Sequence, residues 1–379
     1  MKKVFIFSSL GLALVLFFWG IYSLVFKPAP ENSSSAPSLD SKSALEKTLT
    51  TTTPEKLTPL TDEAVLAPTL NEDGLALKYY SQKAKGFYEI SFDGKIKTLI
   101  LKKELPDSLE ILWSPNKSQA LFKLYPGSSN LQTVFFDFFT QKEIRLSGSL
   151  GNPVWQNENK IIYKYSDPVK KELTLNLSDP DGSNWKKLAD LDFSQVFSAG
   201  IPQSGSISFW KAPDAYTESI LYSVSPLSME KKILFRDEFG ANFLWNSDGT
   251  KALISHSVER AGKKMQLAII NNNGGEYKNL EIPTLISKCA WSKDNKTVYY
   301  ALPGSIPENS ILPDDYYSNK FQTADTFWKV NVLTGEKTRL IDLNKISAKI
   351  DAKNIFLNPD ESLLFFVNRI DGKLYQISL

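Results

Sequence analysis

The chain has 379 residues, of which 42% are hydrophobic and 12% aromatic, enough for a folded body of one large or two modest domains. Its 44 basic and 42 acidic residues nearly balance, so it lacks the basic excess that nucleic-acid binding usually needs, and we expect no nucleic-acid partner. A single cysteine, Cys289, and a single histidine, His256, exclude a disulfide framework and a cysteine-rich or multi-histidine metal centre, so we expect no metal and no other cofactor.

The first expected element is a membrane-spanning helix over residues 4–26. These residues carry no charge, and at about 1.5 Å each they reach across a hydrocarbon core of about 30 Å. A cleaved signal peptide, the alternative, has a shorter apolar region before a small-residue cleavage site, whereas this run ends in Phe26-Lys27. Residues 1–27 are therefore predicted to be an uncleaved signal anchor. Lys2 and Lys3 favour a cytoplasmic amino terminus and, despite Lys27, place the rest of the chain outside the cytoplasm, in a bacterial cell envelope.

A tether is expected next, over residues 28–54. Serine, threonine and proline dominate this segment, and it contains no aromatic residue. Such a composition cannot bury enough apolar surface to offset the entropy of ordering, so we expect a disordered spacer.

Between residues 55 and 379 one sequence pattern recurs seven times: an apolar anchor residue, a turn and a hydrophobic strand. Successive anchors are about 42 to 46 residues apart, except for a last gap of about 66. The anchors are Leu70, Trp113, Trp155, Ile201, Trp245, Trp291 and Leu357. A period of about 40 to 50 residues with several short strands is typical of propeller blades. The sequence therefore predicts an all-β fold, a seven-bladed β-propeller of four-stranded antiparallel blades, in which the tryptophans pack between blades.

The last repeat has only three predicted strands. The segment from Glu55 to Glu63 resembles the fourth strands of other repeats, and Pro59 is compatible with an edge strand. We expect this segment to complete the last blade and close the ring, because closure leaves no open sheet edge.

No catalytic motif is recognised, so we do not expect an enzyme. His256 lies on a predicted strand and no G-x-S-x-G motif is present, which favours a packing or surface role. Asp179, Asp181 and Asn184 fall short of a calcium cage and are interpreted as a strand-connecting turn.

The turns carry a family resemblance. The string SDPDGSNWKKLADL at 178–191, with WSPNKSQALF and WNSDGTKALI, resembles the repeat of TolB-like, or WD40-like, propellers, which also occur in dipeptidyl-peptidase-IV-type proteins. The resemblance covers roughly residues 60 to 379 and implies blade architecture rather than an activity. Because an anchor and tether stand where TolB has an α/β domain, TolB's partners are not carried over.

In such propellers the loops between second and third strands share a face that commonly binds ligands. These loops are long here, and the sixth repeat has an insertion at residues 303–325, which is either a binding loop or an ornamental excursion. The candidate partner-binding residues are Trp210, Tyr216, Asp314, Asp315, Tyr316 and Tyr317. We expect a membrane-tethered binding or scaffold module for an envelope protein, peptide or glycan, of unspecified oligomeric state. The alternative is an envelope polysaccharide hydrolase or lyase with carboxylates in the propeller channel.

Overall fold

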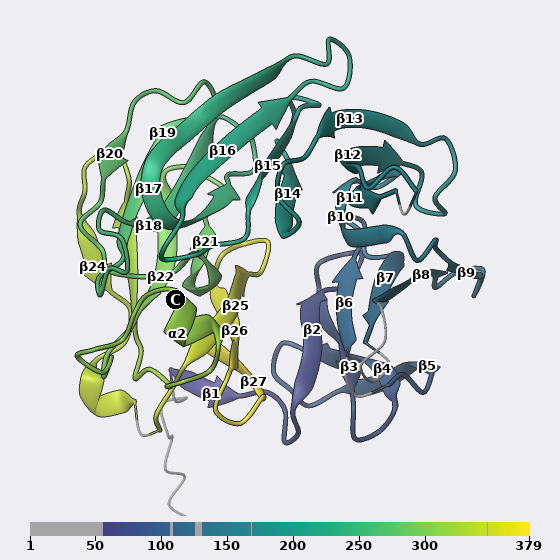
Figure 1. The fold of residues 1–379 in the computed structure, drawn as a ribbon. Helices are drawn as coiled ribbons and strands as arrows, with labels where there is room; N and C mark the ends of the chain where they lie inside the picture. Colours follow the sequence, from purple (N-terminus) through teal and green to yellow (C-terminus); the bar gives the residue numbers. More distant parts are fainter. Residues whose placement is uncertain (1–55, 107–108, 126–130, 168, 347) are drawn as a thin grey trace, which may run out of the picture. The chain divides into compact units, whose positions relative to one another are not determined.

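The computed structural model describes residues 56–106, 109–125, 131–167, 169–346 and 348–379. Over these ranges the fold is all-β, and the strands succeed one another in antiparallel sheets (Figure 1). The expected membrane helix at 4–26 and the tether at 28–54 lie outside the described residues. Within those that are described, no helix combines the length and apolar character that a membrane crossing needs.

Five of the sheets have four strands each. The first three repeats follow chain order and comprise β2 (Val65–Leu70), β3 (Ala76–Ser81), β4 (Gly86–Ser91), β5 (Lys97–Lys102), β6 (Leu109–Trp113), β7 (Gln119–Leu124), β8 (Gln132–Asp137), β9 (Glu143–Arg145), β10 (Leu150–Asn157), β11 (Lys160–Ser166), β12 (Leu173–Ser178) and β13 (Lys186–Asp190). The sixth repeat comprises β21 (Cys289–Trp291), β22 (Thr297–Leu302), β23 (Thr326–Asn331) and β24 (Lys337–Arg339). The seventh repeat comprises β25 (Ala352–Leu357), β26 (Leu363–Asn368), β27 (Leu374–Ser378) and β1 (Leu57–Pro59).

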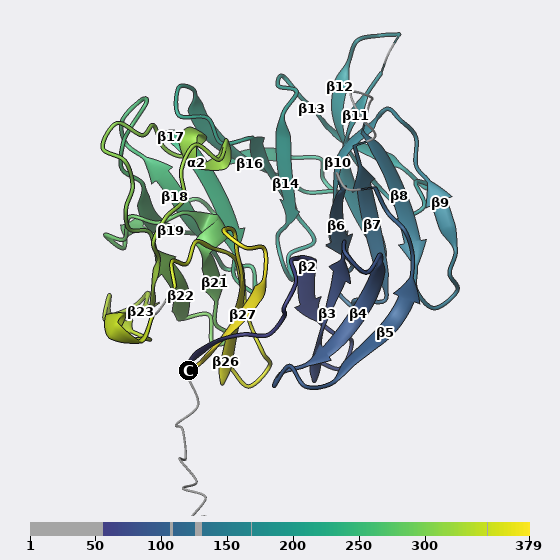
Figure 2. The same ribbon diagram turned by 90° about the horizontal axis from the view of Figure 1, so that it is seen from below.

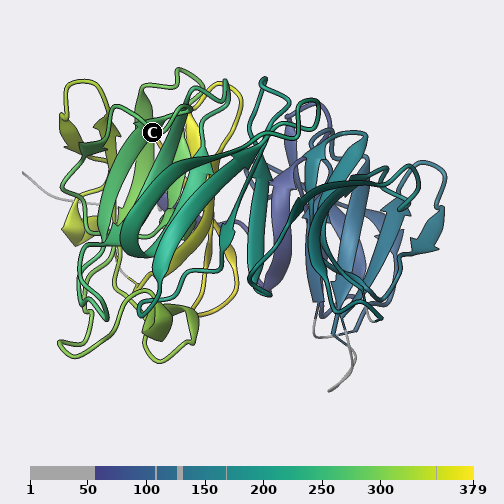
Figure 3. The same cartoon turned by 45° about the horizontal axis from the view of Figure 1, so that its top comes forward.

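The fourth and fifth repeats form one seven-stranded sheet instead of the two separate blades that the sequence predicted. Its strands are β14 (Val196–Gly200), β15 (Ile207–Lys211), β16 (Glu218–Val224), β17 (Lys231–Trp245), β18 (Lys251–Ser257), β19 (Gln266–Asn271) and β20 (Lys278–Asn279). The first part of the 15-residue β17 pairs with β16 and its second part with β18 (Figure 3). Asp237 and Gly240 have positive φ, and the register shifts beside them, so a bulge bends this strand where the sequence predicted the boundary between two blades.

The amino-terminal strand closes the last sheet, as predicted. β1 pairs antiparallel with β27, with Leu57 opposite Ile377 and Pro59 opposite Tyr375 (Figure 2). Beyond the strand, the Leu60 amide donates a hydrogen bond to the Leu374 carbonyl at 2.8 Å. The fourth strand of the seventh repeat therefore comes from the opposite end of the described chain.

The core lies between repeats rather than within one of them. Across the described residues, seven clusters of buried apolar side chains each combine two neighbouring repeats, and one of them joins the seventh repeat to the first. Three anchor tryptophans donate their indole N–H to a carbonyl of the preceding repeat: Trp113 to Ala67 at 2.8 Å, Trp155 to Leu112 at 2.9 Å, and Trp291 to Leu244 at 3.1 Å. The predicted packing role of these tryptophans is confirmed.

Candidate functional site

The insertion at residues 303–325 folds against loops of the two preceding repeats. The Ala215 amide donates to an Asp314 carboxylate oxygen at 3.0 Å, and the Leu312 amide donates to the Gly262 carbonyl at 2.9 Å. These bonds tie the insertion to the loops that follow β15 and β18. The long loops of the fourth, fifth and sixth repeats thus meet on one face, as the resemblance implied.

A short helix in the insertion places one tyrosine in the interior. The helix α2 (Asp314–Tyr317) carries Tyr316, whose side chain is buried against Met265, Leu285 and Leu312. The Tyr316 hydroxyl donates to a carboxylate oxygen of Asp351 at 2.8 Å. The insertion is therefore anchored to the fold by both apolar and polar contacts.

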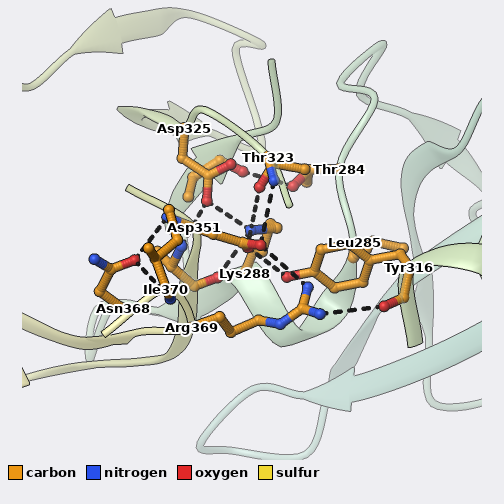
Figure 4. A network of polar contacts seen from close by, with 12 residues as sticks. Thr284, Leu285, Lys288, Tyr316, Thr323, Asp325, Asp351, Asn368, Arg369 and Ile370 are labelled. Carbon is orange, nitrogen blue, oxygen red and sulfur yellow. Dashed lines mark hydrogen bonds and ion pairs between the residues drawn. The ribbon is translucent and has the colours of Figure 1, made fainter. Parts of the chain in front are cut away.

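Beneath the insertion lies a buried lysine with two carboxylate partners (Figure 4). Lys288 ends the 3-10 helix η1 (Ile286–Lys288), and its side chain is fully buried. Its Nζ donates to Asp325 Oδ2 at 2.6 Å and to Asp351 Oδ1 at 2.7 Å. Further contacts reach the Thr323 hydroxyl at 3.1 Å and the Ala352 carbonyl at 2.9 Å. This cation joins the sixth repeat to the start of the seventh.

Arg369 completes what we call the buried network, the set Lys288, Tyr316, Thr323, Asp325, Asp351 and Arg369. Its guanidinium donates to Asp351 Oδ2 at 3.2 Å and lies 4.0 Å from the centre of the Tyr316 ring. Two cations thus balance two carboxylates. Burial is the largest single influence on Asp351 and opposes its ionisation, but the charge and hydrogen bond of Lys288, the Tyr316 hydroxyl and Arg369 together outweigh it and lower the pKa of that carboxyl. At Asp325 burial dominates and raises the pKa.

Next to the network is a cavity of about 140 Å³ that we call the cationic cavity. It is lined by Ser287, Tyr316, Tyr317, Asn319, Lys353, Asn354 and Arg369. Burial and the neighbouring Arg369 lower the pKa of Lys353. The buried Ser287 hydroxyl interacts with the hydroxyl of Tyr317. Cations and hydroxyl groups therefore converge beside Tyr317, where an acidic group of a partner could bind.

The structure brings five of the six predicted site residues together. Tyr216 is 45% exposed and Tyr317 is 39% exposed, so both can contact a partner. Asp314 accepts the backbone bond described above, and Asp315 is ion-paired with Lys320 at 2.6 Å. Tyr316, by contrast, faces inward and anchors the insertion.

Trp210 is the exception. It lies on β15 and not in the following loop, and it is 4% exposed. Its ring packs against Phe243 in the core shared by the fourth and fifth repeats, with 5.2 Å between ring centres. The expectation that Trp210 is a surface contact is wrong, because the strand runs further than the sequence indicated.

The sequence analysis missed Lys288, Asp325, Asp351 and Arg369. A usable signal was present for one of them: Lys288 interrupts the apolar run TLISKCAW immediately before an anchor, where a lone charge needs a buried partner. Within the described ranges, no group of three or more His, Cys, Asp or Glu side chains is placed to hold a metal ion.

Known structures share the fold. No family model and no curated protein matches the chain significantly. An oligogalacturonate lyase in complex with manganese is matched with a TM-score of 0.60 and 13% identity over 85% of this chain and 93% of that one. The oligogalacturonate lyase of Vibrio parahaemolyticus gives a TM-score of 0.60 and 10% identity over 86% and 94%.

A propeller domain without an enzyme name is also similar. The Cps50 (Swd1) β-propeller domain of Myceliophteria thermophila gives a TM-score of 0.54 and 10% identity over 85% of this chain and 99% of that one. At such identities the similarity defines an all-β, propeller-like fold and no particular family within it. A likeness to TolB of Acinetobacter baumannii, at a TM-score of 0.45, carries no further argument.

Proposed function

We propose that the chain is a seven-bladed propeller, tethered to the membrane by residues 4–26 and displayed outside the cytoplasm, where it binds an envelope protein, peptide or glycan. Seven sequence repeats and seven clusters between repeats support the count of seven, with β17 serving two blades. The uncharged segment at 4–26 and the tether at 28–54 support the location.

One observation carries the binding role: the anchored insertion presents Tyr317, and the loop after β15 on which it docks presents Tyr216, on the same face. The Tyr216 ring lies 5.5 Å from the Arg260 guanidinium, which also donates to the Tyr216 carbonyl at 3.0 Å. Aromatic residues held by a rigid scaffold dominate binding hot spots. Because Lys353 and Arg369 line the cationic cavity beside Tyr317, a partner with an acidic group suits this face best.

The face favours binding over the alternative of a polysaccharide lyase or hydrolase. Such an enzyme needs a carboxylate that reaches its substrate, but Asp325 and Asp351 are fully buried and neutralised by Lys288 and Arg369. The oligogalacturonate lyases named above have this fold, yet that similarity alone supports no activity.

The test is capture of partners from crosslinked membranes with the intact protein as bait. We expect the double variant Tyr216→Ala/Tyr317→Ala to recover its main partner with at least about tenfold lower yield, since loss of two aromatic anchors exceeds about 1.4 kcal/mol. Point substitutions are preferred because excising the insertion would remove Tyr316 and Thr323 from the buried network.

The matched control is Phe139→Ala, which removes an aromatic side chain that is 93% exposed in the second repeat. Its yield should equal that of the unmodified protein. Undiminished capture by the double variant would rule out this face as the binding surface.

A further inference from the structure

A second cavity, of about 420 Å³, lies on the third repeat where it meets the second. We call it the aromatic cavity, because Tyr163 and Tyr165 of β11 and Trp185 of the turn before β13 line it. Arg145, at the end of β9, and Asn176 of β12 add polar groups. These residues come from other repeats than the face with Tyr216 and Tyr317.

The turn that carries Trp185 is fixed in place although the side chain itself is 65% exposed. Asp179 accepts hydrogen bonds from Lys160 at 2.5 Å and from the Asn184 side chain at 2.6 Å. The Gly182 amide donates to the Asp179 carbonyl at 2.9 Å. An exposed indole on a preorganised turn offers a flat apolar surface at little entropic cost to binding.

Asn176 supplies an unused hydrogen-bond acceptor at the cavity. Its side chain is 2% exposed, and its Oδ1 has no hydrogen-bond partner among the described residues. The Asn176 side-chain amide group donates a hydrogen bond to the Tyr163 hydroxyl, and the Asn176 carbonyl oxygen Oδ1 takes no part in this bond. A buried acceptor without a donor destabilises the folded protein. A hydroxyl group entering the cavity would satisfy it.

The charges around the cavity select against anions. Asp167, Asp181 and Arg145 are the charged residues of its lining, so two carboxylates and one guanidinium surround the cavity. Hydrogen bonds from the Lys170 amide to Asp167, and from the Ser183 hydroxyl to Asp181, lower the pKa of each carboxyl. Both are ionised at neutral pH, so the lining carries a net negative charge that repels uronic acids.

We propose that the aromatic cavity binds a neutral pyranose unit of a polysaccharide. The apolar face of the sugar ring lies on Trp185 and Tyr165, and one ring hydroxyl donates to Asn176 Oδ1. The volume admits a ligand the size of one or two sugar rings, and a wall of aromatic side chains with a few converging polar groups is the usual composition of small-molecule sites. This binding is independent of the partner proposed for the insertion face.

The test is calorimetric titration of the full chain with cellobiose, maltose, lactose and chitobiose, with digalacturonate as the anionic comparison at constant ionic strength. We expect at least one neutral disaccharide to bind with a Kd below about 1 mM, and Trp185→Ala to weaken it at least about tenfold. Asn176→Leu should also weaken binding at least about tenfold, because it removes the acceptor, and it should leave the melting temperature nearly unchanged, because removal of the unsatisfied acceptor offsets the lost hydrogen bond to Tyr163.

Phe139→Ala and the double variant Tyr216→Ala/Tyr317→Ala are the controls, and both should bind sugar like the unmodified protein. The double variant separates this proposal from the one above, since it should lose partner capture only. The proposal is overturned if no neutral disaccharide binds with a Kd below about 1 mM, if digalacturonate binds best, or if Trp185→Ala leaves the affinity unchanged.

Discussion

Replacing Lys288 with methionine should lower the free energy of unfolding by about 3–5 kcal/mol, because it leaves buried carboxylates without their shared cation. The two carboxylates are not equally affected. Asp351 keeps Arg369 at 3.2 Å and the Tyr316 hydroxyl at 2.8 Å. Asp325 keeps only uncharged donors, the Ala352 amide at 2.7 Å and the Thr323 hydroxyl, and its Oδ1 is buried. Most of the lost free energy of unfolding should therefore come from the unpaired charge of Asp325.

A second substitution tests this assignment. In the Lys288→Met background, Asp325→Asn should restore about 1–3 kcal/mol, since it removes the charge that lost its partner, whereas Asp351→Asn should restore less. The free energies come from urea unfolding followed by tryptophan fluorescence. Lys264→Met, which removes an exposed lysine, should change stability by no more than about 0.5 kcal/mol. A loss below about 1 kcal/mol for Lys288→Met, or further destabilisation by Asp325→Asn, would refute the reasoning.

Two other predictions concern pH and ring closure. Burial lowers the pKa of His256 to about 4, and its Nδ1 lies 3.3 Å from Glu238 and its Nε2 2.9 Å from the Tyr277 hydroxyl. In the unfolded chain the His256 imidazole is protonated near pH 6.5, so neutral His256 contributes fully to the free energy of unfolding above that pH, and about 3 kcal/mol of this free energy is lost as the pH falls towards 4. Glu238 partly offsets this loss, because burial raises the pKa of its carboxyl. His256→Gln should flatten the pH dependence of urea unfolding between pH 7 and 4, and an unchanged slope would contradict this. Deleting residues 28–50 should leave the melting temperature nearly unchanged, whereas deleting 28–62 strips β1 from β27 and should lower it or cause aggregation; equal stability of the two truncations would refute closure.

The architecture could be predicted from the sequence because its signals are local. The turn after each anchor and the spacing of anchors depend on neighbouring residues and on a regular period, and both are visible without a structure. The pairing of β1 with β27 followed from one missing strand at one end and one extra strand at the other.

The joined sheet could not be predicted in the same way. Asp237 and Gly240 are typical turn residues, and the sequence does not distinguish a turn that ends a strand from a bulge that bends it. The difference depends on whether β16 and β18 both pair with the continuous strand, which is a tertiary contact.

The buried network was hidden for another reason. Lys288 pairs with carboxylates 37 and 63 residues further along the chain, so no local pattern links them. Tyr316 and Tyr317 are adjacent and chemically identical in the sequence, yet one is buried and the other is partly exposed. Only the docking of α2 separates an anchor from a surface contact.

Substituting Lys353 of the cationic cavity tests partner binding and folding stability separately, because the two are expected to change differently. Burial and Arg369 lower its pKa, which means that the folded protein disfavours its positive charge. Lys353→Met should therefore leave the melting temperature equal or higher, while capture of an acidic partner falls because the cavity loses a cation. The two readouts are thermal unfolding and recovery from crosslinked membranes. A variant that is destabilised and still captures its partner at full yield would show that Lys353 is structural and that the cavity is not part of the binding face.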